Sequence, residues 1–192
     1  IRYVNNGNPM AAVAVSDALL VAAGVPLKIS DAVVTPRVAL QYKPTEDIML
    51  FASATRGFKS GGWNARSNNP LLLKNFGTES VWSYEAGIRS EFLDRRATAN
   101  LTVFFGDTSN LQIATAVLNP AGGAPVFPVG NFSDFESSGA ELELNYLVTD
   151  GLQLFANAGY NKTEYTNPTA EVVAQQNACL ASIAAAATAR PN

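Results

Sequence analysis

The chain has 192 residues, enough for one domain, and 47% of them are hydrophobic while only 15% are charged. A soluble domain usually carries about 25% charged residues, so a surface this poor in charge is unusual for one. The net charge of −3 disfavours a nucleic-acid partner, the lack of histidine removes the commonest general base, and the single Cys179 cannot form an internal disulfide.

Residues 1–34 do not alternate as a strand would. Asn8 can cap a helix, Pro9 suits the first helical turn, and Gly24 with Pro26 can close the helix. We predict a short helix within a long extracellular loop, and a disordered segment is the alternative.

Six strands are predicted between residues 35 and 165, because apolar and polar residues alternate there with a period of two. Their predicted ranges are 35–42, 48–58, 81–92, 97–114, 134–148 and 152–165. The alternation is clearest in 81–92, where one face carries Trp82, Tyr84, Ala86, Ile88 and Phe92. The other face of this strand carries Ser83, Glu85, Gly87, Arg89 and Glu91.

The connections between these strands alternate between short and long. Residues 43–47, 93–96 and 149–151 are short turns, and Gly151 is expected to supply a positive φ in the last of them. Residues 59–80 and 115–133 are long loops. Short turns at one end and longer external loops at the other are typical of outer-membrane barrels.

Two further features favour a membrane barrel over a soluble sandwich, whose strands also alternate. The strand over 97–114 exceeds the usual strand length of about 5–6 residues. Aromatic residues also lie near strand ends on the apolar face, where an interface girdle is expected, namely Tyr42, Trp82, Phe92, Tyr146 and Tyr160. We therefore predict an all-β fold, an antiparallel transmembrane β-barrel segment with long extracellular loops.

Residues 166–192 resemble the opening segment in pattern, since Asn167-Pro168 can start a helix and an Ala-rich run follows. We predict an extracellular loop with an Ala-rich helix. Six strands cannot close a barrel in lipid, because the smallest known barrels have about 8 and each unpaired amide in hydrocarbon costs several kcal/mol. The chain is therefore expected to be six consecutive strands cut from a larger barrel.

Residues 48–64, IMLFASATRGFKSGGWN, form a strand that ends in Arg-Gly-Phe-Lys-Ser-Gly-Gly-aromatic. Pro36-Arg37 precedes this strand, and Ser83-Tyr84-Glu85-Ala86-Gly87 follows it. This order of elements resembles the barrel of TonB-dependent outer-membrane receptors, and the resemblance covers roughly residues 35–165. It implies a plugged barrel of about 22 strands in the bacterial outer membrane. The implied partners are outer-membrane lipid, a small-molecule ligand such as a ferric chelate, and TonB, reached through a plug domain outside this chain.

Two functions remain open at this point. The first is active import of a scarce ligand such as a ferric siderophore, with energy from TonB and no chemistry on the substrate. The second is a passive pore, or a structural or adhesive barrel, without a plug. The resemblance does not identify the ligand.

The ligand-contact candidates are cations and an aromatic residue in the first long loop, namely Lys59, Trp63, Arg66 and Lys74. An exposed aromatic ring with cations suits an anionic chelate or a sugar, and an ordinary solvated loop is the alternative. The Gly61-Gly62 pair lacks the Lys-Ser/Thr continuation of a phosphate-binding loop, so we predict a bend at the root of the loop.

Four carboxylates share the polar strand faces: Glu85, Glu91, Glu141 and Glu143. An enzyme would use such groups as general acid and base. We favour instead lumen residues paired with Arg89 and similar cations, because no nucleophile, histidine or metal-ligand cluster accompanies them. We therefore expect no catalytic site, no bound metal and no cofactor.

Overall fold

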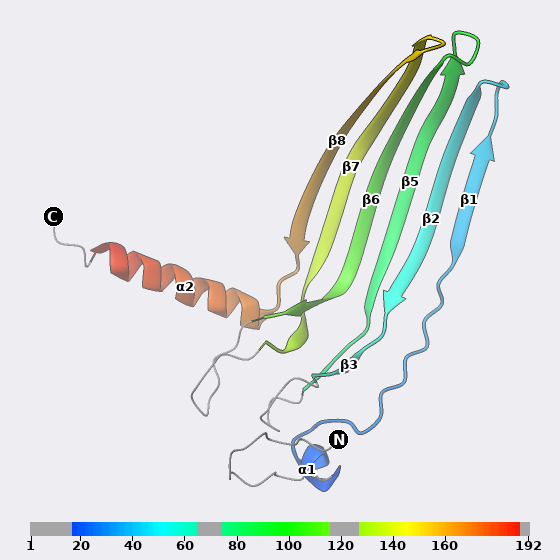
Figure 1. Cartoon of the computed structure of the whole chain (residues 1–192). Helices are drawn as coiled ribbons and strands as arrows, with labels where there is room; N and C mark the ends of the chain where they lie inside the picture. The colour runs from blue at the N-terminus through cyan, green and yellow to red at the C-terminus, as the bar shows by residue number, and fades with distance from the viewer. Residues whose placement is uncertain (1–16, 65–73, 116–126, 189–192) are drawn as a thin grey trace, which may run out of the picture. The chain divides into compact units, whose positions relative to one another are not determined.

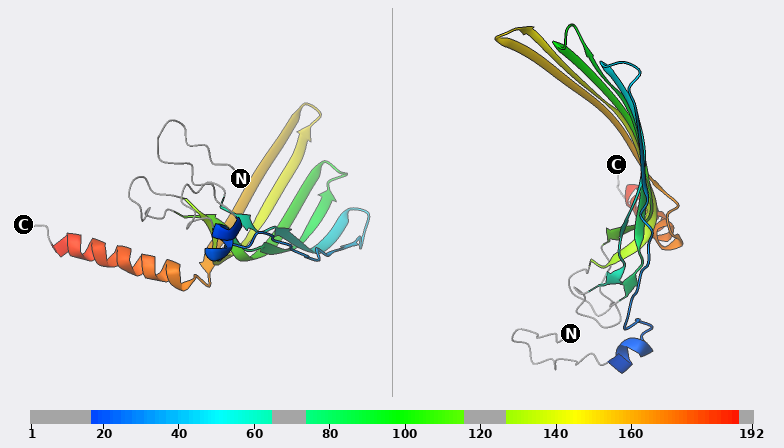
Figure 2. Two further views of the ribbon diagram at one scale, coloured as in Figure 1. Left: turned by 90° about the horizontal axis from the view of Figure 1, so that it is seen from below. Right: turned by 90° about the vertical axis from the view of Figure 1, so that its right-hand side faces the viewer.

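The computed structural model describes residues 17–64, 74–115 and 127–188. Six long strands form one antiparallel sheet in the order β1-β2-β5-β6-β7-β8, so every strand pairs with its neighbours along the chain (Figure 1). Their bounds are β1 (Arg37–Tyr42), β2 (Ile48–Lys59), β5 (Glu79–Phe92), β6 (Ala97–Ala114), β7 (Val129–Thr149) and β8 (Leu152–Thr166). The sheet is curved along its strands, as Figure 2 shows. The predicted all-β, antiparallel class is confirmed.

Four shorter or separate elements complete the described chain: α1 (Asp17–Ala22), β3 (Gly62–Trp63), β4 (Asn75–Phe76) and α2 (Ala170–Thr188). The helix α1 falls in the segment predicted to contain a helix, whereas Asn8 and Pro9 lie outside the described residues. The helix α2 occupies the Ala-rich run. No helix in these described ranges combines the length and the hydropathy needed to cross a membrane.

Two predicted loop assignments were wrong. The range 59–80, predicted as loop throughout, contains the paired strands β3 and β4 as well as the start of β5 at Glu79. The strand β7 begins at Val129, within the range predicted as loop, rather than at Asp134. Both extensions carry glycine and asparagine, which hide the strand pattern in the sequence.

The chain divides into two compact units. The first comprises residues 1–33, 59–79 and 110–131, and the second comprises residues 34–58, 80–109 and 132–192. The second unit holds most of the six-stranded sheet, and the first holds the ends of both long connections.

The register of the sheet confirms that each strand has one apolar face. Across β5 and β6, Tyr84 lies opposite Phe105, Ala86 opposite Val103, and Ile88 opposite Leu101. Across β7 and β8, the matching pairs are Leu142 with Ala158, Leu144 with Ala156, and Tyr146 with Leu154. Because residues directly opposite each other project to the same side, these pairs build one continuous surface, called here the apolar face. The opposite side is called the polar face.

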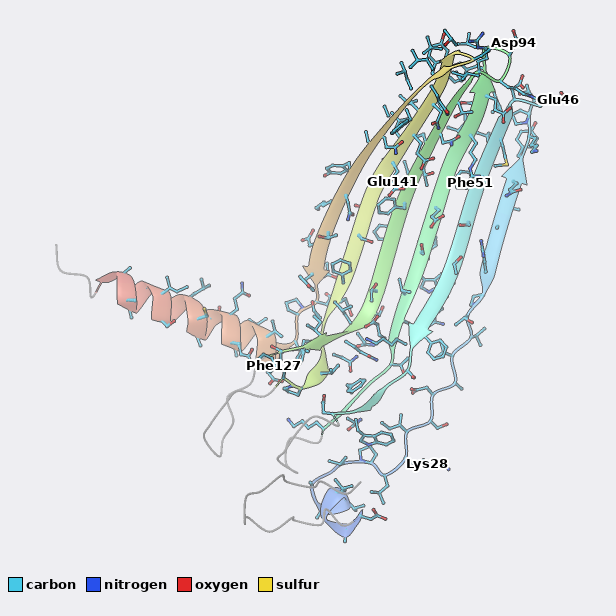
Figure 3. All side chains as sticks on the ribbon, in the orientation of Figure 1. Lys28, Glu46, Phe51, Asp94, Phe127 and Glu141 are labelled. Atoms are coloured by element: carbon cyan, nitrogen blue, oxygen red, sulfur yellow. The ribbon has the colours of Figure 1, made fainter. Side chains whose placement is uncertain are left out.

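Along the middle of β6, the apolar face is the more exposed one. On β6, Leu101, Val103 and Phe105 are 42%, 47% and 40% exposed, whereas Thr102 and Phe104 between them are half-buried. Within the described ranges, the only buried hydrophobic residues are Val25 and Ala97. Side chains project from both faces of the sheet, as Figure 3 shows for the strands that carry Phe51 and Glu141. Burying apolar surface is the main favourable term in folding, so this face requires an apolar environment outside the chain.

The height of the apolar face matches a bilayer. On β5 it runs from Trp82 to Phe92, which is roughly 33 Å of strand at about 3.3 Å per residue. A strand tilt of about 40° reduces this to about 25 Å, the height of the apolar band of outer-membrane barrels.

Aromatic rings mark the end of this band nearer the long connections. Trp82 stacks on Tyr84 with ring centroids 5.9 Å apart, and Tyr84 stacks on Phe105 at 6.3 Å. The Arg56 guanidinium carbon lies 5.9 Å from the centroid of the Trp82 ring, and Asp107 is the cross-strand partner of Trp82. Charged groups beside stacked aromatic rings are typical of the membrane interface, where amphipathic side chains keep their polar ends in water.

The polar face is closely packed around Phe51, an aromatic residue of β2 that lies opposite Gln41 on this face. A Cβ atom on Gly87 would lie 2.7 Å from the Phe51 ring, so only glycine leaves room for the aromatic side chain. The Arg89 guanidinium carbon lies 5.4 Å from the centroid of the same ring. Phe51 therefore occupies a glycine site on the neighbouring strand and carries a cation–π contact.

The short turns follow β1, β5 and β7, and the long connections follow β2 and β6, so each kind lies at its own end of the sheet (Figure 1). The expected positive φ of Gly151 was wrong, because the φ of this residue lies outside the left-handed region. Among the short turns, the left-handed conformation is found instead at Leu93, Asp94 and Arg95, with φ of 58°, 52° and 64°. The turn at 93–96 thus reverses the chain without glycine.

Candidate ligand-binding site

All four predicted ligand-contact residues lie in the range 59–79 of the first unit, and the structure describes three of them. Lys59 ends β2, Trp63 lies in β3, and Lys74 directly precedes β4. All three side chains are exposed. Arg66 lies outside the described residues. Two cations and an indole therefore belong to one compact part of the chain.

The pairing of β3 with β4 explains the Gly-Gly-aromatic sequence. Gly62 lies opposite Phe76, and Trp63 lies opposite Asn75. A Cβ atom on Gly61 would lie 2.6 Å from the Phe76 carbonyl oxygen, and one on Gly62 would lie 2.9 Å from the Phe76 ring. The two glycines thus permit a close approach of two chain segments, and this approach brings Trp63 next to the segment of Lys74.

Trp63 is held from a distant part of the sequence. Its indole Nε1 donates a hydrogen bond to the Pro26 carbonyl oxygen at 2.7 Å. The neighbouring Gly61 amide donates to the Asp31 carboxylate at 3.1 Å. The ring still remains 41% exposed. A fixed and exposed aromatic ring offers contact area at little entropic cost to a ligand.

Asn64 joins the two long connections to each other, and the sequence interpretation had missed it. The residue is 7% exposed. Its Nδ2 donates to the carbonyl oxygens of Val129 at 2.8 Å and Lys74 at 3.1 Å. Its Oδ1 accepts from the Val129 amide at 2.6 Å. The buried amide is thereby satisfied on both its donor and its acceptor side.

Asn131, near the start of β7, makes the same kind of contact with the backbone of the first long connection. Its Oδ1 accepts from the Gly77 amide at 2.6 Å. Its Nδ2 donates to the carbonyl oxygens of Gly77 at 3.1 Å and Asn110 at 2.6 Å. A residue at the end of the second long connection thus holds the end of the first.

Gln112 completes this set. Its Nε2 lies within hydrogen-bond distance of the carbonyl oxygens of Lys59 at 3.3 Å, Ser60 at 3.0 Å and Gly77 at 3.0 Å. Its backbone amide donates to the Glu79 carboxylate at 2.7 Å. We call Asn64, Gln112 and Asn131 together the amide clamp. No motif in the sequence signals it, because all but one of its partners are backbone atoms.

The four carboxylates of the polar face do not pair with Arg89 as expected, since that guanidinium lies over the Phe51 ring. Glu91 does pair with another cation, Arg95, at 3.5 Å, as expected, and Glu143 accepts a 3.4 Å hydrogen bond from Asn100. Across their strand pairs, Glu85 lies opposite Phe104 and Glu141 lies opposite Gly159. Within residues 17–64, 74–115 and 127–188, no group of three or more His, Cys, Asp or Glu residues is arranged to hold a metal ion.

The six-stranded sheet is not closed, and its apolar face has the height of the apolar band of a bilayer. Hydrogen bonds also join the two long connections near the points where they meet the sheet. These features together define a segment of an outer-membrane barrel. Residues 5–181 match the family described as TonB dependent receptor-like, beta-barrel. The chain belongs to this family, whose members reside in the outer membrane of Gram-negative bacteria.

Among named relatives, the chain is 28% identical over 132 residues to the metal-pseudopaline receptor CntO of Pseudomonas aeruginosa. The match covers 69% of this chain and 17% of that receptor. The ferric-pyoverdine 358 receptor of Pseudomonas putida is also 28% identical over 132 residues, with 69% of this chain and 15% of that receptor covered. The chain therefore spans only a small part of the length of these relatives.

Solved structures share the fold. The ferric yersiniabactin uptake receptor FyuA of Yersinia pestis superposes with a TM-score of 0.57 at 23% identity, over 69% of this chain and 19% of that one. The FrpB iron transporter of Neisseria meningitidis superposes with a TM-score of 0.54 at 17% identity, over 71% and 20% of the two chains. Both likenesses support a partial, unclosed barrel wall.

Cysteine labelling tests which end of the sheet faces the medium. In a Cys179→Ser background, which removes the exposed native thiol, Ser60→Cys should react with an impermeant maleimide on intact cells. Thr45→Cys should react only after the outer membrane is permeabilised, because short turns lie on the periplasmic side. Both positions are exposed, so accessibility within the protein is matched. Labelling of Thr45→Cys but not of Ser60→Cys on intact cells would invert the topology.

Proposed function

We propose that the protein containing this chain imports a metal chelate across the outer membrane with energy supplied by TonB. Support comes from the family and from relatives that are named as receptors for metal-pseudopaline and ferric pyoverdine. The observation that carries the proposal is the exposure of Lys59, Trp63 and Lys74 at the ends of the first long connection, with the Trp63 indole held by the Pro26 carbonyl oxygen.

This group suits an anionic chelate. Two lysine ammonium groups attract negative charge over a distance of about a Debye length, roughly 8–10 Å at physiological ionic strength. The anchored indole adds a flat apolar surface for a ring of the ligand. Arg66 belongs to the same proposal as a further cation of the loop.

The remaining partners follow from the same proposal. The apolar face contacts outer-membrane lipid, and a plug domain outside this chain fills the lumen and reaches TonB. The family consists of receptors and transporters rather than enzymes, and the protein is proposed to leave its substrate chemically unchanged. Uptake of the chelate that persists in cells lacking TonB would indicate a passive pore, and the absence of uptake in cells that have TonB would indicate a structural or adhesive barrel.

Binding of ⁵⁵Fe-labelled ferric pyoverdine to cells producing the receptor tests the site. Trp63→Ala should weaken binding about 30-fold, since truncation of a central tryptophan commonly costs about 2 kcal/mol. Lys59→Gln with Lys74→Gln should weaken it further and reduce its dependence on salt.

The chain offers matched controls for these variants. Trp82→Phe changes the other tryptophan of the chain, on the apolar face, and Lys162→Gln changes an exposed lysine of β8. Both should bind as the unmodified receptor does. Equal losses in the controls and in the site variants would contradict the assignment of the site.

A further inference from the structure

Within the first unit, the amide clamp connects the four points at which the two long connections leave and re-enter the sheet. These points are called here the roots of the connections. The first connection leaves β2 at Lys59 and re-enters the sheet at Glu79, and the second leaves β6 at Ala114 and re-enters at Val129. Gln112 contacts Lys59, Ser60, Gly77 and Glu79, Asn64 contacts Val129, and Asn131 contacts Gly77. Residues separated by as many as 65 positions are joined in this way.

In two of these contacts, a side-chain amide forms the pair of hydrogen bonds that a backbone residue forms in an antiparallel sheet. The Asn64 amide accepts from the nitrogen and donates to the oxygen of one residue, Val129. The Asn131 amide does the same to Gly77. A backbone peptide in an antiparallel pair exchanges these two hydrogen bonds with its partner. Each asparagine therefore fixes the register of a segment on the other connection, not merely its proximity.

The clamp also reaches the candidate contact residues themselves. The Lys74 carbonyl oxygen accepts from the Asn64 side chain at 3.1 Å and from its backbone amide at 3.2 Å. The Lys59 carbonyl oxygen lies within hydrogen-bond distance of Gln112. Trp63 lies directly between Asn64 and the glycine pair in sequence. Any slip of the clamp therefore displaces the backbone from which all three side chains project.

We infer that the amide clamp is a positioning device that holds the roots of both long connections in register, so that Lys59, Trp63 and Lys74 are presented together to an anionic chelate. This inference rests on the proposed function and deepens it. The clamp side chains need not touch the ligand. Their contribution lies in pre-organisation, which lowers the entropic cost of binding.

Because the clamp side chains are uncharged amides, their role can be distinguished from that of the lysines by the dependence of affinity on salt. Salt screens the attraction between exposed lysines and an anion, but it has little effect on hydrogen bonds of uncharged side chains. Loss of the clamp should therefore lower affinity by the same factor at low and high ionic strength. Loss of Lys59 and Lys74 should instead flatten the dependence of affinity on salt.

The test compares variants of the receptor in cells, with ⁵⁵Fe-labelled ferric pyoverdine as the probe. Asn64→Leu and Asn131→Leu keep the side-chain size but remove every clamp hydrogen bond at their position. Each is expected to weaken binding at least 10-fold with an unchanged salt dependence, and the double variant should lose less than the product of the two. Asn64→Gln keeps a neutral side-chain amide and should lose less than Asn64→Leu.

Asn100→Leu is the matched control. Asn100 lies in β6 and donates a 3.4 Å side-chain hydrogen bond to Glu143 within the sheet. This variant should bind as the unmodified receptor does. A heat-modifiability gel establishes that each variant retains its folded barrel.

A second readout does not depend on any ligand. Hydrogen exchange of the purified receptor in detergent should accelerate in residues 74–79 and 127–131 together when Asn64 is replaced by leucine, because one side chain holds both segments. Exchange in the sheet around Ile88 should stay unchanged.

The outcomes separate the two proposals. Folded Asn64→Leu and Asn131→Leu variants that bind as the unmodified receptor does, or that exchange faster in only one segment, would overturn the positioning role. Loss of the folded barrel in these variants and in Asn64→Gln would also overturn it, in favour of a purely structural role. Equal binding by the unmodified receptor and Trp63→Ala would instead count against the proposed site, and the exchange measurement would still decide the clamp.

Discussion

Replacement of Ile88 by arginine is expected to prevent assembly of the barrel wall. Ile88 lies opposite Leu101 near the middle of the apolar face, between the aromatic residues Trp82 and Phe92. An arginine at the midplane on the lipid side of a barrel strand costs about 2–4 kcal/mol. Loss of that much free energy is large beside the usual stability of a protein, so little folded receptor should remain.

The matched substitution is Ser83→Arg on the same strand. Ser83 lies on the polar face opposite Gly106, where a charged side chain can reach water or other polar groups. This variant should assemble far better than Ile88→Arg in a heat-modifiability gel and in urea unfolding. The reverse ranking would show that the strand is shifted by one residue, because such a shift exchanges its two faces.

The second prediction with a large expected effect concerns the association state of residues 1–192 when they are produced alone. Residues 1–192 in detergent micelles should form aggregates or associated species rather than a stable monomer. Among the residues that the structure describes, β1 and β8 each have a paired strand on one side only. An unpaired edge presents free amide and carbonyl groups that pair with another chain. The polar face supplies no core either, because Glu85, Arg89 and Glu141 cannot be buried together without partners.

Light scattering after size-exclusion chromatography provides the measurement. A monodisperse, protease-resistant monomer with sharp amide resonances would contradict the need for further strands. A covalent fusion to adjoining strands of the whole receptor serves as the control, and it should reduce association in proportion to the edges that it covers.

The six-stranded sheet could be predicted from the sequence because its faces are chemically distinct. A period of two with apolar residues on one side leaves a single register for a strand such as β5, and the pairing of Tyr84 with Phe105 confirms it. The alternation of turn lengths then orders the strands as an up-and-down sheet. These are local signals, and each strand carries its own.

The structure at the ends of the long connections could not be predicted, because the residues that contact each other there lie far apart in the sequence. The strands β3 and β4 have two residues each, which is too short for a periodic pattern. Asn64, Gln112 and Asn131 are ordinary polar residues until the fold brings backbone atoms to them. The partner of Arg89 was misjudged for the same reason, since Phe51 belongs to a neighbouring strand.

The alternation of short and long connections also governs how such a protein can change. Doubling the length of a flexible loop adds only about 0.6 kcal/mol of closure entropy, so insertions into a long connection are expected to cost little. The short turns cannot accept them, because a single added residue would shift a strand and reverse its faces. Over evolution, the long connections are therefore expected to vary in length and sequence more than the strands and the short turns do.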